Sequence, residues 1–187
     1  RLIRTPLFGP LDIKLFYFIN SGIKNRLFDS ILPFFSLDWL TFAIIGIFFI
    51  YLTVNKGVKV SLVFLIAFIL IFPLSIALKK TASLTRPYVG LSDVNYYDDN
   101  SQWQLVKSTT APDSNNRSSF PSGHALRFFV LVGFLWKRKK IRLLLLVTGL
   151  LIMFSRVYTG AHYPSDTIAG ALIAAYLGFL AQKIAIL

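Results

Sequence analysis

The sequence predicts an all-α integral membrane protein, a helical bundle of about five to six transmembrane helices with interfacial helices at its N-terminus. Of the 187 residues, 55% are hydrophobic and only 15% are charged, whereas an average soluble domain has roughly 25% charged residues. Several apolar runs also approach the 20 or so residues that a bilayer requires. These observations exclude a disordered chain, and a single domain covering 1–187 is expected from the length.

The clearest predicted span is 60–78, which has no charged residue and lies between Lys59 and Lys79. Further spans are expected at 39–54, 119–136, 141–158 and 167–187. The last three contain histidine, arginine or lysine, so they reach full length only if these residues lie near the membrane interface. The first residues lack the charged and then apolar pattern of a secretory signal peptide, so none is expected in the printed chain.

The N-terminal segment 1–38 has a different pattern. Within 11–35, aromatic and aliphatic residues alternate with charged ones, namely Asp12, Lys14, Lys24, Arg26 and Asp29. Such a mixture is typical of helices that lie in the headgroup region. We therefore expect a pair of interfacial helices, with a tilted sixth span as the alternative.

A long polar loop is predicted at 88–118. It contains more acidic than basic residues, namely Asp93, Asp98, Asp99 and Asp113 against Lys107 and Arg117. A loop of this length in a compact protein is more often functional than accidental.

Polar residues gather at four predicted helix ends. They close the second and fourth spans and open the third and fifth, so an antiparallel bundle places all of them on one side of the membrane. The connections 55–59 and 137–142, on the other side, are rich in lysine and arginine, which marks the cytoplasmic side. The polar cluster and the long loop are therefore expected to face the periplasm, the cell exterior or a lumen.

The net charge of +12 does not predict a nucleic-acid partner. Much of it lies in the short connections, where it sets topology and attracts anionic lipid headgroups. It does not form a basic stripe with interleaved aromatic residues. The predicted partners are membrane lipids, and no protein partner is evident.

The polar cluster has the composition of a phosphate site. It contains three cations, Lys79, Arg86 and Arg156, and a guanidinium binds phosphate oxygens two at a time. Ser122 and Gly123 open a predicted helix, whose free N–H groups favour an anion. Two histidines and Asp166 complete the set, so an acid and a nucleophile are available.

Three motifs carry a resemblance to a known family. They are Lys79 with Arg86-Pro87 after six residues, Pro121-Ser122-Gly123-His124, and Ser155-Arg156 followed by His162 and Asp166. In this order and with this spacing they resemble the signatures of the type 2 phosphatidic acid phosphatase superfamily. The resemblance covers 79–166, about half of the chain.

The resemblance implies a metal-independent phosphatase without a cofactor, whose catalytic face points away from the cytoplasm. By position, His162 would attack phosphorus and form a phosphohistidine, and Asp166 would hold and polarise it. His124 would protonate the leaving oxygen and then activate water. The implied phosphate ligands are Lys79, Arg86, Ser122, the Gly123 amide and Arg156.

The implied substrate is a phosphorylated lipid. A compact chain of this kind resembles bacterial enzymes that act on undecaprenyl diphosphate, phosphatidylglycerophosphate or the 1-phosphate of lipid A, in the inner membrane with the site facing the periplasm or exterior. A soluble phosphate ester remains an alternative substrate. A lipid transporter that uses the same anion pocket without catalysis is an alternative function, although it would not need His124 and His162. Soluble vanadate-dependent haloperoxidases share the anion-site pattern, and the predicted spans argue against them.

Arg127 lies outside the three motifs, one helical turn after His124 and within a predicted span. A charge at such a position is costly and is therefore a functional candidate. We expect it to contact a second phosphate or a polar headgroup, and a structural ion pair or a contact with a backbone carbonyl is the alternative.

Overall fold

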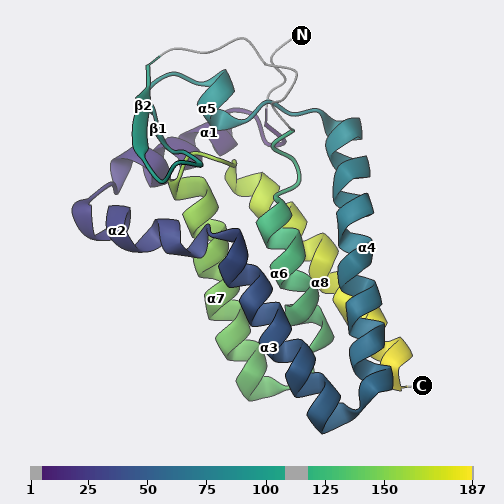
Figure 1. Cartoon of the computed structure of the whole chain (residues 1–187). Coiled ribbons are helices and arrows are strands. Elements are labelled where there is room, and N and C mark those ends of the chain that lie inside the picture. The colour runs from purple at the N-terminus through teal and green to yellow at the C-terminus, as the bar shows by residue number, and fades with distance from the viewer. Residues whose placement is uncertain (1–5, 108–117, 187) are drawn as a thin grey trace.

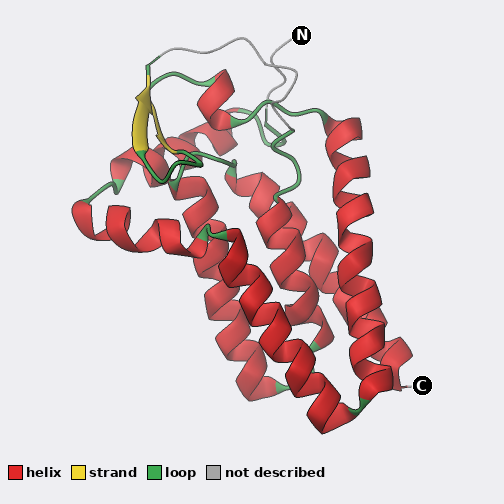
Figure 2. Ribbon diagram, in the orientation of Figure 1, coloured by secondary structure: helices red, strands yellow, loops and turns green. Residues whose placement is uncertain are grey.

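The computed structural model describes residues 6–107 and 118–186 and has the predicted architecture, a helical bundle with a small two-stranded sheet at one end (Figures 1 and 2). In chain order the elements are α1 (Pro10–Tyr17), the π-helical turn η1 (Phe18–Gly22), α2 (Arg26–Phe35), α3 (Asp38–Lys56), α4 (Val58–Ala82), α5 (Pro87–Gly90), β1 (Val94–Tyr97), β2 (Trp103–Val106), α6 (Gly123–Phe134), α7 (Lys139–Tyr158) and α8 (Pro164–Ile186).

Four helices of the described chain, α3, α4, α7 and α8, are long and apolar enough to cross a membrane. Their outer faces carry large exposed apolar side chains, among them Ile50 on α3, Ile66 on α4 and Leu143 on α7. Apolar surface of this extent is stable against lipid and not against water. The protein is therefore an integral membrane protein, as predicted.

The expected span at 119–136 is instead a short central helix. The helix α6 has 12 residues, a length of about 18 Å, against a hydrocarbon core of about 30 Å. Nearly all of its residues are buried, and it lies among the longer helices (Figure 1). Its apolar sequence reflects contact with protein on all sides, which composition alone does not distinguish from contact with lipid.

Glycines bring α6 and α8 into close contact. A Cβ at Gly133 of α6 would lie 2.0 Å from the carbonyl oxygen of Ala175, and a Cβ at Gly178 of α8 would lie 2.0 Å from that of Val130. Both neighbours are backbone atoms, which cannot move aside as a flexible side chain can. Small residues of this kind let helix backbones approach within a membrane.

The N-terminal segment forms α1, η1 and α2, none of which is long enough to span a bilayer. The helix α2 has 10 residues, about 15 Å, and runs crosswise to the long helices (Figure 1). Leu27, Ile31 and Phe34 are exposed on it while Leu32 is buried. These lengths exclude the sixth-span alternative, and the exposed apolar face fits helices at the interface.

Asp12 was expected to be a charged residue at the membrane interface, but it lies inside the protein. Its side chain is buried, and its carboxylate accepts hydrogen bonds from the backbone N–H of Ser165, at 3.0 Å, and from the Ser165 hydroxyl. It thus satisfies a free N–H in the first turn of α8. Asp12 thereby attaches α1 to the helix that carries Asp166.

The predicted loop at 88–118 is partly folded. The strands β1 and β2 form an antiparallel hairpin in which Val94 is opposite Val106. The N–H of Tyr97 donates to the carbonyl of Thr159 at 3.1 Å, and Asn20 of η1 donates to the carbonyl of Asn95 at 2.7 Å. These bonds attach the hairpin to the bundle. Asp113 and Arg117 lie outside the described residues.

The close α6–α8 contact predicts a selective effect of alanine substitutions. Gly178→Ala should lower the free energy of unfolding by about 1–3 kcal/mol, because the added methyl group overlaps the backbone of α6. Gly46→Ala on α3 is the matched control, because a Cβ there meets nothing within 4 Å. Thermal unfolding in detergent should show a lower midpoint for Gly178→Ala alone. Equal midpoints for both variants would contradict the packing described here.

Candidate active site

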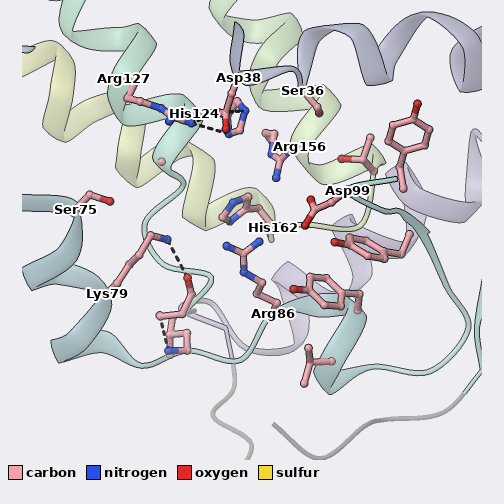
Figure 3. Close-up of a pocket in the computed structure, with 18 of the residues that line it drawn as sticks. Ser36, Asp38, Ser75, Lys79, Arg86, Asp99, His124, Arg127, Arg156 and His162 are labelled. Carbon is pink, nitrogen blue, oxygen red and sulfur yellow. Dashed lines mark hydrogen bonds and ion pairs between the residues drawn. The ribbon is translucent and has the colours of Figure 1, made fainter. Parts of the chain in front are cut away.

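The three sequence motifs converge at one end of the bundle because antiparallel helices place their polar ends together. Lys79 lies near the end of α4 and Arg86 precedes α5. Gly123 and His124 begin α6, while Arg156 and His162 lie at the end of α7 and just after it. These residues line one cavity of about 1610 Å³ (Figure 3).

His162 lies in the turn between α7 and α8, and its side chain is only 3% exposed. Its Nδ1 atom is 3.6 Å from Oδ2 of Asp166, a fully buried residue in the first turn of α8. The same oxygen accepts the N–H of Tyr163 at 2.9 Å, which fixes the carboxylate. With Nδ1 directed at Asp166, Nε2 is the nitrogen available to a ligand.

Burial lowers the pKa of His162 well below its ordinary value near 6.5, and the positive charges of Arg86, Arg156 and Lys79 lower it further. Figure 3 shows Arg86 and Arg156 near the His162 ring, on different sides of it. The imidazole is therefore neutral around pH 7 and keeps a lone pair for nucleophilic attack.

The start of α6 offers free hydrogen-bond donors. Ser122 is buried, and its hydroxyl has no hydrogen-bond partner within the described residues. Gly123 is the first residue of α6, so its N–H has no acceptor within the helix. A Cβ at Gly123 would meet nothing within 4 Å, which leaves open space beside this amide. A helix N-terminus with such space is suited to an oxyanion.

Contacts between α6 and α8 fix the relative position of the two motifs. The N–H of Ser122 donates to the carbonyl of Asp166 at 3.0 Å. A Cβ at Gly170 would lie 2.9 Å from the carbonyl oxygen of Ser122, so the absence of a side chain there permits the approach. The donors of α6 and the imidazole after α7 are thereby held at one site.

Lys79 and Arg156 contribute positive charge in different ways. Nζ of Lys79 donates to the carbonyls of Ser118 and Pro121, each at 2.9 Å, and so holds the segment that precedes α6. Nε of Arg156 is buried and has no hydrogen-bond partner in the part of the chain that the structure describes. A buried guanidinium donor without an acceptor is available to an anionic ligand.

Ser155, from the third motif, has a structural role. Its hydroxyl donates to the carbonyl of Leu32 at 2.5 Å and lies 2.6 Å from the hydroxyl of Ser36. It therefore fastens α7 to α2 and does not line the cavity.

The sequence analysis did not single out Asp38, although it lines the cavity beside His124. Its Oδ1 atom is 3.0 Å from Nε2 of His124, and Nη2 of Arg127 contacts the same oxygen. The only sequence signal was its place as the acidic residue before a predicted span. Arg127 thus forms the structural ion pair that was the alternative for it, and its expected contact with a second phosphate stays a prediction.

The comparisons with known proteins agree with this geometry. The sequence model of the PAP2 superfamily matches residues 56–185, well over half of the chain. The chain belongs to the PAP2 superfamily. The predicted resemblance is therefore confirmed, and the protein is a phosphatase in a family of membrane lipid phosphatases.

Relatives in the PAP2 superfamily extend over most of the chain. A bacitracin transport permease protein, BcrC of Bacillus licheniformis, is 29% identical over 89% of this chain and 76% of its own length. A lipid A 4'-phosphatase of Bacteroides thetaiotaomicron is 28% identical over 94% of this chain and 77% of its own. The crystal structure of Aquifex aeolicus LpxE matches with a TM-score of 0.75 and 26% identity, over 96% of this chain and 99% of that one.

The charges around His162 predict its titration in this PAP2 protein. The chain has two histidines, so His124→Gln labelled with ¹⁵N-imidazole gives NMR signals from His162 alone. We expect His162 to titrate below pH 6.5, and Arg86→Met to move that titration to higher pH because one repelling cation is removed. An imidazolium spectrum that persists above pH 6.5 would contradict this environment.

Proposed function

We propose that the protein hydrolyses a phosphate monoester or diphosphate headgroup of a lipid, through a phosphohistidine on His162. The observation that carries the proposal is the convergence of a neutral, carboxylate-oriented imidazole with the free donors of Gly123 and Arg156 at one cavity, beside the unpartnered hydroxyl of the buried Ser122. The cavity opens at one end of apolar, membrane-spanning helices, where a lipid headgroup would lie.

Binding in this proposal is largely electrostatic. The phosphoryl oxygens receive hydrogen bonds from the N–H of Gly123 and the hydroxyl of Ser122, and they lie among the charges of Lys79, Arg86 and Arg156. Phosphoryl transfer depends mainly on positioning and on stabilising charge at these oxygens. Donors that are held in place before the substrate arrives stabilise such charge effectively.

The proposed reaction has two steps. In the first, Nε2 of His162 forms a bond to phosphorus while the bond from phosphorus to the leaving oxygen breaks, and His124 gives that oxygen a proton. Asp166 stabilises the positive charge that develops on His162. In the second step, water attacks phosphorus, His124 accepts a proton from it, and the P–N bond breaks to release phosphate.

The lining of the cavity supports an amphiphilic substrate. Away from the cations, it continues along Ile71, Phe72 and Ile76 of α4 and Leu37 before α3. An acyl or prenyl chain can lie against these side chains, whereas a small soluble phosphate ester would leave them without contacts. Undecaprenyl diphosphate, phosphatidylglycerophosphate and lipid A phosphates all share the required chemistry, and one relative is named as a lipid A 4'-phosphatase.

We further propose that the site faces the periplasm or exterior from a bacterial inner membrane. At the opposite end of the bundle, Lys56 ends α3, Lys59 lies in the first turn of α4, and the basic run 137–140 joins α6 to the start of α7. An excess of lysine and arginine in short connections is typical of the cytoplasmic side.

The proposed function predicts a strict dependence on His162. In detergent without divalent metal, the parent protein should release inorganic phosphate from a panel of lipid phosphates and diphosphates. His162→Ala should lower the rate by at least about 10³-fold, because the loss of a nucleophile removes the main pathway. The assay should include a thermal unfolding curve to confirm that the variant is folded. Equal release by both proteins would exclude a phosphohistidine on His162, and no release by either protein would favour transport without catalysis.

A further inference from the structure

Asp38 lies where it can act on His124. It is the first residue of α3, its side chain is 60% exposed, and it lines the same cavity as His124 and Arg127 (Figure 3). It belongs to none of the three motifs, which start at Lys79. Helix dipole stabilisation would explain an acidic residue in the first turn of α3, but it does not explain a contact with an imidazole of another helix.

The contact brings a carboxylate within ion-pair distance of one nitrogen of His124. Oδ1 of Asp38 is 3.0 Å from Nε2 of His124. The contact is an ion pair and not an aligned hydrogen bond, because Nε2 has no hydrogen-bond partner within the described residues. The ring is nearly buried, and Asp38 lines the cavity beside it, so the Nε2–H group is available to a ligand in that cavity.

Arg127 holds Asp38 in this position. Nη2 of Arg127 contacts the same Oδ1 atom and lies 3.4 Å from Nδ1 of His124. The guanidinium also lies over the ring of Phe42, with its central carbon 5.3 Å from the ring centroid. A guanidinium held by several contacts in this way positions its partner more precisely than a mobile surface lysine would.

The charges around His124 explain why a carboxylate is needed. To act as a general acid, the ring must carry a proton on each nitrogen and therefore a positive charge. Burial of the ring opposes that charge most and lowers the pKa of His124, and Arg156 and Arg127 lower it further. Within the described residues, Asp38 is the one carboxylate within ion-pair distance of His124, and its negative charge acts against these effects and raises the pKa of the ring.

We propose that Asp38 is a positioning residue for the general acid His124, which it orients through Nε2 and keeps able to hold a transferable proton. The inference rests on the proposed function. During P–O cleavage the alkoxide leaving oxygen becomes far more basic than a carboxylate, so the Nε2 proton passes to that oxygen and not to Asp38. His124 is left as a neutral imidazole with its proton on Nδ1.

The dependence of the rate on the leaving group tests this role. Two substrates carry the same alkyl chain and differ in the leaving group. One is an alkyl monophosphate, and the other is a nitrophenyl monophosphate with that chain attached to its ring. The alkoxide needs a proton to leave, whereas the acidic nitrophenol does not. Asp38→Asn should lower kcat/KM for the alkyl phosphate by about 10- to 100-fold and for the nitrophenyl phosphate by less than about 3-fold, with the loss mainly in kcat.

Three variants complete the experiment. Asp99→Asn removes the same charge from the same cavity, without a described contact to His124, and should leave the ratio of the two substrates unchanged. Asp38→Glu should recover part of the alkyl phosphate activity. In a His124→Gln background, Asp38→Asn should cause no further selective loss, because the residue through which it acts is gone.

Equal loss on both substrates would show that Asp38 has only a structural role, and no loss on either would show that it has none. Both results overturn the inference and leave the proposed function standing. His162→Ala, measured on the same substrates, distinguishes a failure of the proposed function from a failure of the inference about Asp38. If that variant hydrolyses both as fast as the parent protein, the proposed function fails and the inference fails with it.

Discussion

The cost of placing charge in a bilayer constrains the whole structure. Lys79, Arg86 and Arg156 cannot be dispersed over the apolar helices without a large loss of stability, so they lie at helix ends on one side of the bundle. Burial of His162 lowers its pKa, and the cations at that end lower it further, which keeps the imidazole neutral. The same arrangement that makes the cations tolerable in a membrane protein therefore creates a site for an oxyanion.

Close packing converts this arrangement into a defined geometry. Gly133 and Gly178 bring the backbones of α6 and α8 together, and the bond from Ser122 to the carbonyl of Asp166 sets their register. Because α6 is short and buried, its N-terminus lies inside the cavity.

The sequence predicts the parts of this account that depend on local pattern. Apolar runs reveal α3, α4, α7 and α8, and the spacing of the motifs predicts that His162 and Asp166 lie together. The sequence does not reveal that α6 is buried inside the bundle, because surfaces that contact lipid and surfaces that contact protein have similar apolar residues. Asp12 and Asp38 were not recognised because their partners, Ser165 and His124, are distant in the chain and become neighbours only in the folded bundle.

The central claim is that one cavity positions His162 against a tetrahedral oxyanion held by donors from three motifs. A structure of the protein with orthovanadate, which mimics phosphate and accepts a fifth ligand, tests it most directly. The account predicts vanadium bonded to Nε2 of His162, with its oxygens beside the Gly123 amide, Arg86 and Arg156. Vanadate bound away from His162, or coordinated with none of these donors in contact, would contradict it.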